Sequence, residues 1–469
     1  MNKKYKALIK DTFIFAIGGI GSKVILFLLV PLYTNYLTTE EYGTADLIFT
    51  LSQLIIPFVS LVIFDAVLRF ALSESEKKED VLLCSLAVFS VGSIVTVLIT
   101  PFIGLYETVS PWKWHLCIYI IINIFMSIEL SYIKAKGYNK LYSFVSILQT
   151  LSMALTNILF IVIIPLGVDG YVLANIIGNS IAAILIFFLA KIYSDIFKAK
   201  FSLSLLKKML IYSTPLILNN LSWWIIFSAN KIMVELILGA SVLGIYTVAT
   251  KIPSLINVFI SIFQQSWGIS TVRELESSND SKFYSSVFDI YSFFAFGLSI
   301  FLILIIKPLM TVYVGESFIE SWIYIPILLA SATFSALASY FGALHSALKK
   351  SFNGMVTTLI AALCNILVSI ILLNYIGLWG AIIGTFSAYV ILAITRIFDV
   401  LRYIKIDLDY KLLAVNSLIL ISQAISVSLK LNIYIVSSIA IILFVIFNFK
   451  LIRNLFEKIK ARKNEKNDV

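Results

Sequence analysis

Long apolar stretches separated by short polar joints run along almost the whole chain. Each stretch offers the roughly 20 apolar residues that a membrane-spanning helix needs. The longest polar joint, from about Lys191 to Lys208, is far shorter than the roughly 50 residues of a small independent domain. We therefore predict an all-α polytopic membrane protein of about fourteen transmembrane helices with no soluble domain. The predicted helices cover residues 12–36, 45–70, 81–105, 114–135, 142–164, 170–190, 211–237, 244–269, 283–306, 322–347, 353–373, 380–399, 412–429 and 432–450.

The composition leads to the same class of protein. Hydrophobic residues make up 60% of the 469 residues and charged residues only 13%. Soluble domains lie nearer 45–50% apolar and about 25% charged. The solvent for most of this surface is therefore lipid.

The positions of the basic residues predict the orientation. Cytoplasmic loops carry the excess of Lys and Arg, and a cytoplasmic N-terminus leaves only Lys113, Lys307 and Lys430 of the 36 basic residues on the opposite side. We expect a multi-pass protein of the bacterial inner membrane with both termini in the cytoplasm. The net charge of +10 then reflects topology and contact with anionic membrane lipids, and no nucleic-acid partner is expected.

Two pairs of segments indicate an internal duplication. The segment LTTEEYGT from Leu37 resembles LGASVLGI from Leu238, and TNILF from Thr156 resembles CNILV from Cys364. Both pairs are separated by just over 200 residues and hold matching helix positions. Because each half has six helices, the repeats are parallel, and a central cavity between two lobes follows.

The repeat and the helix count together predict four regions of the chain. They are an N-terminal six-helix lobe at 1–209, a C-terminal six-helix lobe at 210–405, two additional transmembrane helices at 406–450 and a basic cytoplasmic tail at 451–469.

Four basic residues within the predicted helices point to an anionic cargo. An ionisable side chain at the bilayer centre costs at least about 2.5–3.5 kcal/mol and usually faces a cavity or a partner. Lys23 lies roughly 16 Å from either end of its helix, too far for its stem to reach the interface. With Arg69, Lys231 and Lys251 it gives a cavity of positive charge, which suits phosphate. These four residues are the predicted substrate-binding cations.

A structural interpretation stands beside the functional one for several polar residues. Lys231 could pair with Glu235, and Asp65 with Arg69, because each pair is spaced i, i+4. Asp46 and Glu129 lie near helix ends, where we expect them to be solvated.

Three amides, Asn219, Asn220 and Asn230, could bind sugar hydroxyls or bond between helices. A second set of oxygen ligands, Glu235, Asn365, Ser369 and Thr385, would suit a small coupling cation. Coupling to H⁺ or Na⁺ is possible on this basis, and we expect no other cofactor and no metal site.

Catalytic signals are missing from the sequence. The two histidines, His115 and His345, are expected to be packed or interfacial, and the Asp407–Asp409 motif lies on a short joint. No GxxxxGK[ST] phosphate-binding loop occurs. We therefore predict a transporter rather than an enzyme.

The stretch VPLYTNYLTTEEYGTADL from Val30, followed by FDAVLRF from Phe64, resembles the opening of the polysaccharide-transporter family, the Wzx-type flippases. The LG, LGIY and ATKIP elements between Leu238 and Pro253 look like the start of the second half in that family. Its superfamily, the multidrug/oligosaccharidyl-lipid/polysaccharide (MOP) exporters, also holds the multidrug and toxic-compound extrusion (MATE) pumps and peptidoglycan-precursor flippases. The resemblance implies two MATE-like lobes that alternate between inward-open and outward-open states.

The resemblance also implies a cargo and partners. The cargo would be an undecaprenyl-pyrophosphate-linked oligosaccharide for O-antigen, capsule or a similar polysaccharide, moved from the cytoplasmic to the outer leaflet. A polysaccharide polymerase and other envelope assembly proteins would be partners. Cations on helices one, two and eight of the precursor flippases correspond broadly to Lys23, Arg69 and Lys251 here.

Two other functions remain open. A MATE-like drug or cation exporter would favour carboxylates and aromatic rings in the cavity over lone lysines. A membrane polysaccharide polymerase would need a long outer loop to hold its site, and the predicted loops are short.

Overall fold

The computed structural model describes residues 21–73, 76–277, 281–454 and 457 of the chain. Within these ranges the chain forms α-helices joined by short loops and a few turns of 3₁₀- and π-helix. The chain divides into two compact units, Met1–Thr247 with Val314–Phe318, and Val248–Tyr313 with Ile319–Val469.

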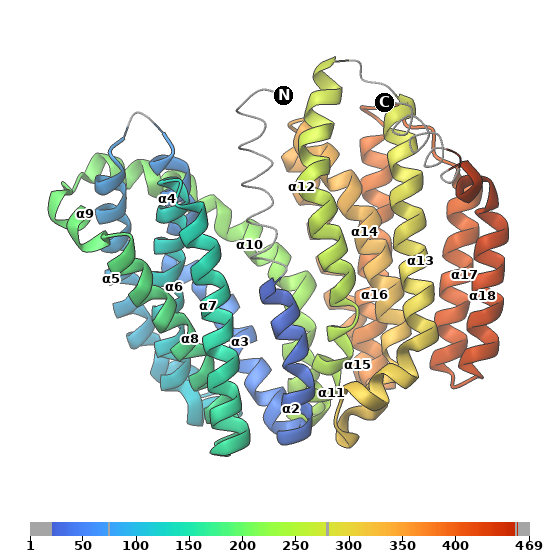
Figure 1. Cartoon of the computed structure of the whole chain (residues 1–469), viewed down its shortest axis with the longest axis horizontal. Coiled ribbons are helices and arrows are strands. Elements are labelled where there is room, and N and C mark those ends of the chain that lie inside the picture. Colours follow the sequence, from blue (N-terminus) through green and yellow to red (C-terminus); the bar gives the residue numbers. More distant parts are fainter. Residues whose placement is uncertain (1–20, 74–75, 278–280, 455–456, 458–469) are drawn as a thin grey trace, which may run out of the picture. The chain divides into compact units, whose positions relative to one another are not determined.

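The first unit packs around α6, which contacts helices that come before and after it in the sequence (Figure 1). Its elements are α2 (Val30–Tyr36), α3 (Thr39–Ser60), α4 (Ile63–Ala71), α5 (Lys78–Ile103), η1 (Ser110–Trp112), α6 (Lys113–Ala135), α7 (Asn139–Asn157), η2 (Ile158–Ile163), α8 (Gly167–Leu189), α9 (Ile192–Lys198), α10 (Leu203–Leu238) and the first part of α11 (Ala240–Lys251).

The second unit packs around α14, which contacts α12, α13, α15, α16 and α17. Most side chains of α14 are buried, in keeping with this central place (Figure 1). The elements of the unit are α12 (Ser254–Ser277), α13 (Ser281–Tyr313), the latter part of η3 (Glu316–Ile323), α14 (Ile325–Ala347), α15 (Ser351–Ile376), α16 (Leu378–Val400), α17 (Tyr410–Ser428) and α18 (Ile433–Phe447).

Local sequence signals set the helix boundaries near the site described below. Thr38 and Glu41 form a capping box, in which the Thr38 hydroxyl accepts from the Glu41 backbone N–H and the Glu41 carboxylate accepts from the Thr38 backbone N–H. This reciprocal bonding satisfies two donors at the start of α3. At the other end, Leu61 and Val62 adopt φ of 49° and 53°. The left-handed pair interrupts the hydrogen-bond ladder and separates α3 from α4.

The described residues contain ten helices that are long and apolar enough to span a membrane, or up to twelve if each of two bent pairs is one span. The predicted fourteen agree roughly with this count. The first predicted helix lies partly outside the described residues, and α18 is shorter than the other spans, with 15 residues. Most of the predicted basic tail at 451–469 lies outside the described residues.

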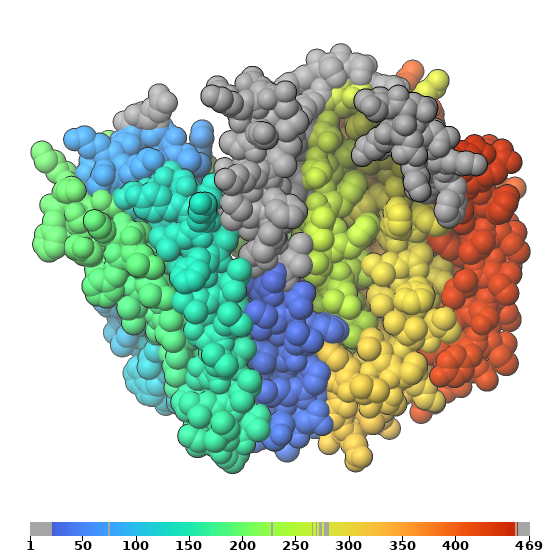
Figure 2. Space-filling view, viewed as in Figure 1, coloured from blue at the N-terminus to red at the C-terminus, as the bar shows by residue number. Residues whose placement is uncertain are grey.

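The outward surface of α18 is apolar, as expected of a helix that faces lipid. Ile435, Ile439, Ile442 and Ile446 are all exposed, and Figure 2 shows the α17–α18 pair, in red, at the surface of its unit. Exposed aliphatic side chains of this density are favourable in a bilayer and unfavourable in water. The fold is therefore that of a multi-span membrane protein. The compact units are defined by contacts between residues, whereas the predicted lobes, with boundaries at residues 209 and 405, are defined by the sequence repeat. The division into lobes therefore stays a prediction.

Candidate functional site

A buried carboxylate joins three helices of the first unit. Asp46 on α3 is only 7% exposed, and its Oδ2 atom lies 2.7 Å from Nζ of Lys231 on α10. The same oxygen accepts a hydrogen bond from the Thr247 hydroxyl on α11, at 3.0 Å. Ionised groups in spanning helices are expensive unless paired, and here the ammonium and the carboxylate neutralise each other. We call Asp46, Lys231 and Thr247 the charged cluster.

The helices that carry Asp46 and Thr247 cross with their backbones in close approach. A Cβ added to Gly43 would lie 2.0 Å from the carbonyl oxygen of Ala240, and one added to Gly244 would lie 2.0 Å from the carbonyl oxygen of Thr39. Only glycine permits helices to approach this closely. We call this contact the α3–α11 crossing.

The crossing has the symmetry of the sequence repeat. In the alignment of Leu37 with Leu238, Gly43 corresponds to Gly244, Thr39 to Ala240, and Asp46 to Thr247. Gly43 approaches Ala240, and in the same way its counterpart Gly244 approaches Thr39, the counterpart of Ala240. Asp46 accepts a hydrogen bond from its own counterpart, Thr247. The expected duplication therefore places equivalent segments against each other, as around a local twofold axis.

Further polar contacts surround the crossing. The hydroxyls of Thr39 and Ser241 lie 2.7 Å apart. The backbone N–H of Gly315 donates to the Thr34 hydroxyl at 3.1 Å, and a Cβ on Gly315 would meet the Thr34 carbonyl oxygen at 2.1 Å. Segments that are distant in the sequence are thus joined here by hydrogen bonds and close backbone contacts, and the buried Tyr42 ring of α3 also packs edge-on against Phe318.

Glu235 does not pair with Lys231, although their i, i+4 spacing allowed it. Its carboxylate accepts hydrogen bonds from the Tyr106 hydroxyl and, at 2.5 Å, from the Thr108 hydroxyl. Lys231 and Glu235 therefore contact different neighbours: Lys231 binds α3, and Glu235 binds the loop between α5 and η1.

The other predicted cations differ in exposure. Lys23 and Arg69 are exposed on the first unit, and Lys251, which belongs to the second unit, is half-buried. Among the described residues no ion pair joins Asp65 to Arg69, and both side chains are exposed. The role of these three cations in binding stays a prediction.

The expectation that Asp46 and Glu129 are solvated is wrong. Asp46 is buried in the charged cluster, and Glu129 is fully buried in α6, where no described residue hydrogen-bonds its carboxyl oxygens. The expectation rests on the short distance of both residues from a helix end. Their burial is instead determined by the neighbouring helices that pack against them, which the local sequence does not reveal.

The predicted amides lie along one helix. Asn219 on α10 is exposed, Asn220 donates to the Leu216 carbonyl oxygen at 3.0 Å, and Asn230 is buried. Binding of sugar hydroxyls by these residues stays a prediction.

The predicted coupling-ion ligands fall in both units. Asn365 and Ser369 are buried on α15, and the Ser369 hydroxyl donates to Oδ1 of Asn365 at 3.2 Å. Thr385 on α16 donates to the Ala381 carbonyl oxygen. Glu235 belongs to the other unit and has the partners described above, so neither unit by itself contains all four ligands.

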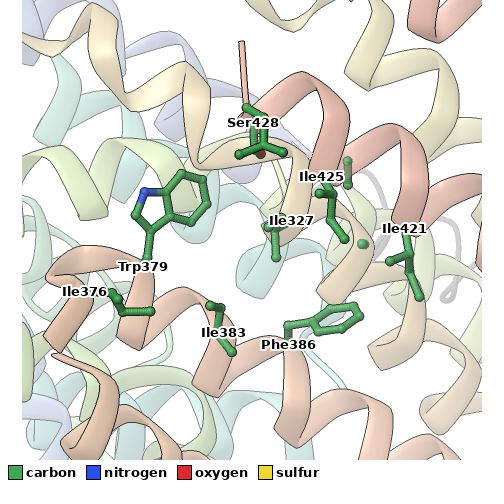
Figure 3. Close-up of a pocket in the computed structure, with 11 residues that line it drawn as sticks. Ile327, Ile376, Trp379, Ile383, Phe386, Ile421, Ile425 and Ser428 are labelled. Atoms are coloured by element: carbon green, nitrogen blue, oxygen red, sulfur yellow. The ribbon is translucent and has the colours of Figure 1, made fainter. Parts of the chain in front are cut away.

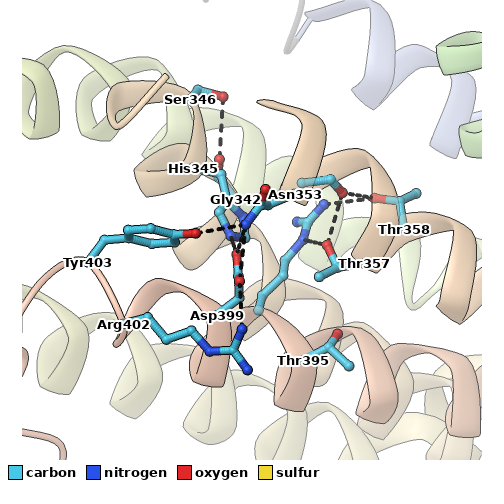
Figure 4. A network of polar contacts seen from close by, with 12 residues as sticks. Gly342, His345, Ser346, Asn353, Thr357, Thr358, Thr395, Asp399, Arg402 and Tyr403 are labelled. Carbon is cyan, nitrogen blue, oxygen red and sulfur yellow. Dashed lines mark hydrogen bonds and ion pairs between the residues drawn. The ribbon is translucent and has the colours of Figure 1, made fainter. Parts of the chain in front are cut away.

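A polar network in the second unit was not predicted. Arg396 on α16 is 5% exposed and donates to the Ala338 carbonyl oxygen and to the Thr358 hydroxyl, each at 3.0 Å. One turn further on, Asp399 lies 2.8 Å from Nε2 of His345 (Figure 4). His345 is buried, which confirms that it is a packed histidine. The network was missed because Arg396 and Asp399 lie near a helix end and resemble loop charges.

The second unit also contains an apolar pocket of about 480 Å³ between α14, α16 and α17. Trp379 and Phe386 of α16 and Ile327 of α14 line it, facing Ile421 and Ile425 of α17 (Figure 3). Almost no polar atom reaches this pocket, so its chemistry suits a hydrocarbon chain.

These features define an all-α, multi-span membrane protein with polar contacts buried inside apolar helices. Solved structures share this fold. The lipid II flippase MurJ in an inward closed conformation matches with a TM-score of 0.68 and 17% identity, over 95% of this chain and 100% of that chain. An inward-facing multidrug resistance MATE family transporter of the MOP superfamily matches with a TM-score of 0.63 and 16% identity, over 81% and 97%.

The chain belongs to the polysaccharide biosynthesis protein family, whose model matches residues 8–268. Lsg locus putative protein 1 of Haemophilus influenzae is 22% identical over 256 residues, which are 54% of this chain and 62% of that protein. An uncharacterized membrane protein of the same organism is 23% identical over 263 residues, with the same coverage. This chain thus spans somewhat less than two thirds of the length of these relatives.

Proposed function

We propose that this protein flips undecaprenyl-pyrophosphate-linked oligosaccharide units, destined for O-antigen, capsule or a similar polysaccharide, across the bacterial inner membrane by alternating access. Family membership supports a role in polysaccharide biosynthesis, and the fold is shared with flippases and exporters. The observation that carries the proposal is the charged cluster at the α3–α11 crossing.

The crossing has the properties of a gate that opens and closes. Its contacts include glycine-to-backbone approaches, hydrogen bonds and one ion pair. Separating such groups exposes polar atoms that water can satisfy, whereas separating a large apolar interface would cost about 25 cal/mol per Å² of apolar surface exposed. In the predicted topology this gate lies on the outer side of the membrane, and the contacts described above would be those of its closed state.

Opening of the gate would change the partner of Lys231. In the closed state its ammonium contacts the Asp46 carboxylate at 2.7 Å. A lipid pyrophosphate offers a stronger negative charge to the same ammonium. We propose that Lys231 exchanges Asp46 for the cargo phosphate, while Lys23, Arg69 and Lys251 attract the headgroup and Asn219, Asn220 and Asn230 contact its sugars.

The polyprenyl tail would stay in an apolar environment throughout. The pocket of about 480 Å³ beside α17 is lined mainly by aliphatic and aromatic side chains. Such a lining suits a segment of isoprenyl chain. An H⁺ or Na⁺ gradient is the proposed energy source, and a polysaccharide polymerase is the proposed downstream partner because it consumes the flipped lipid.

The test is lipid flipping in proteoliposomes with a fluorescent undecaprenyl-pyrophosphate oligosaccharide. The wild type should move the probe. Lys23→Ala should lower the rate about tenfold or more, because a hydrogen bond to a charged group is worth about 1.5–3 kcal/mol. Lys23→Arg should restore most of the rate. Lys430→Ala is the matched control, since it removes one exposed lysine from the predicted outer loops, and it should flip normally.

Two outcomes would contradict the proposal. If Lys23→Ala flips at the wild-type rate, Lys23 is no part of the cargo path. If the wild type ignores the lipid but extrudes small cations, the protein is a drug or cation exporter.

A further inference from the structure

Besides the apolar pocket, the second unit has a groove between α15 and α16, with a volume of about 430 Å³. On α15 the lining residues Phe352, Val356 and Ile360 are spaced four residues apart. Ile394 and Phe398 of α16 continue the same spacing to Arg402, just beyond the end of that helix. The groove therefore runs along both helices for about two turns, roughly 12 Å. Asn353, Asp399 and Arg402 lie toward one end, and Ile360 and Ile394 toward the other. The groove is thus polar at one end and apolar at the other.

The rims of the groove are hydrophobic and open to the surroundings. Phe352 is 71% exposed, Phe398 62%, Ile394 46% and Ile360 44%. Surfaces of this kind on a membrane protein meet lipid chains. The groove is therefore open to the bilayer along its length.

The carboxylate at the polar end is satisfied from inside the unit. Asp399 accepts two contacts from Nδ2 of Asn353, at 3.0 and 3.2 Å, and its Oδ2 lies 2.8 Å from Nε2 of His345. The network in Figure 4 thus uses Asp399 to hold α14, α15 and α16 together. Its negative charge is largely committed to these partners.

The cation beside Asp399 is not committed in this way. Arg402 reaches Asp399 with a single nitrogen at 3.9 Å, and its side chain is 75% exposed. A guanidinium has five N–H donors in a planar fork that fits phosphate. With three quarters of its side chain exposed, Arg402 remains accessible at the groove that it lines.

More cations lie at the ends of the same helices. Lys349 and Lys350 immediately precede α15, and Lys405 follows α16; all three are exposed. Nζ of Lys350 lies 5.0 Å from the centre of the ring of Tyr403, the residue that follows Arg402. The distribution of charge predicts this end to be cytoplasmic, where the leaflet carries anionic lipids.

We propose that the α15–α16 groove is a binding site for an anionic phospholipid. The phosphate contacts Arg402 with support from Lys350, and the first part of an acyl chain lies along Phe398, Ile360 and Ile394. A phospholipid has this arrangement of charge at the interface and hydrocarbon toward the membrane interior. The volume falls within the roughly 300–1,000 Å³ of small-molecule sites. This lipid is distinct from the proposed cargo, and the site does not depend on the flippase function.

Native mass spectrometry of the full-length protein in detergent tests the proposal. Phosphatidylglycerol should bind in preference to phosphatidylcholine. Arg402→Ala should weaken the phosphatidylglycerol adduct about tenfold, the effect of losing one charged hydrogen bond. Lys430→Ala removes an exposed lysine from the predicted opposite side and should leave the adduct unchanged. Because Arg402 is exposed, its replacement should not affect folding.

A second measurement locates the acyl chain. Phe398→Trp puts a fluorophore on the groove rim, and phosphatidylglycerol with brominated chains should quench the added fluorescence more than brominated phosphatidylcholine does. The proposal is overturned if the two lipids bind and quench equally, or if Lys430→Ala weakens binding as much as Arg402→Ala. It is also overturned if the adduct sensitive to Arg402 is a protein or undecaprenyl pyrophosphate rather than phosphatidylglycerol.

Discussion

The α3–α11 crossing of the first unit and the network around Arg396 in the second unit both bury polar groups within apolar helices, but they are built differently. At the crossing, one carboxylate, Asp46, receives an ammonium and a hydroxyl from helices distant in the sequence. In the network, Arg396 and Asp399 bond to α14 and α15, the two helices that precede α16.

The difference indicates which contact can open. The bonds of the network are backed by the packing of the central helix α14, so breaking them would disrupt the second unit. At the crossing, two glycines allow the close approach and a few polar bonds accompany it. These bonds can be exchanged for bonds to water or cargo. We therefore expect mutations at the crossing to change the conformational equilibrium, and mutations in the network to change stability.

The largest effect is expected from Asp46→Ala. The substitution leaves the Lys231 ammonium without the carboxylate that it contacts, and loss of one partner of a buried ion pair costs about 3–5 kcal/mol. The closed state should be strongly depopulated and flipping should fall well over tenfold. Flipping in proteoliposomes, normalised to the amount of folded protein, measures this loss.

The double variant Asp46→Leu/Lys231→Met is the control for this experiment. It removes both charges, so thermal stability should return close to the wild-type value. Flipping should stay low if Lys231 also binds the cargo phosphate. Full recovery of flipping in the double variant would show that the ion pair is purely structural.

A smaller but more specific effect is expected from Gly43→Ala. Its Cβ would lie 2.0 Å from the Ala240 carbonyl oxygen, so α3 and α11 must move apart, at an overpacking cost of about 1–3 kcal/mol. The readout is a disulfide between Thr39→Cys and Ser241→Cys, whose hydroxyls lie 2.7 Å apart, in a protein without its three native cysteines. The disulfide should form in this background, and its rate of formation should fall about tenfold when Gly43→Ala is added.

Gly268→Ala is the matched control, because nothing lies within 4 Å of the Cβ it would add. It should crosslink like the parent. Equal crosslinking in the Gly43→Ala protein would mean that the close approach of α3 and α11 is not needed for the closed state.

Apolar windows predicted most of the fold, because a spanning helix is determined by the local sequence of about 20 residues. The repeat alignment also pairs Gly43 with Gly244 from the sequence alone. The partner of Lys231 could not be predicted in the same way. Local spacing offers Glu235 one turn away, whereas Asp46 comes into reach only when α10 packs on α3. Arg396 was missed for a related reason, since its distance from a helix end does not reveal the burial that α14 imposes.

The smallest effect on transport is expected from Arg396→Met. The change removes the bonds to Ala338 and Thr358 but also removes a charge that is costly to bury, so the net loss of stability should be only about 1–3 kcal/mol. Thermal unfolding should show a lowered midpoint. At temperatures below that midpoint the flipping rate should stay within about twofold of wild type, since the free-energy difference between the transport states should change by less than about 0.5 kcal/mol. A loss of flipping as large as that of Asp46→Ala, with unchanged thermal stability, would contradict the comparison. It would mean that the network, like the crossing, changes its contacts during transport.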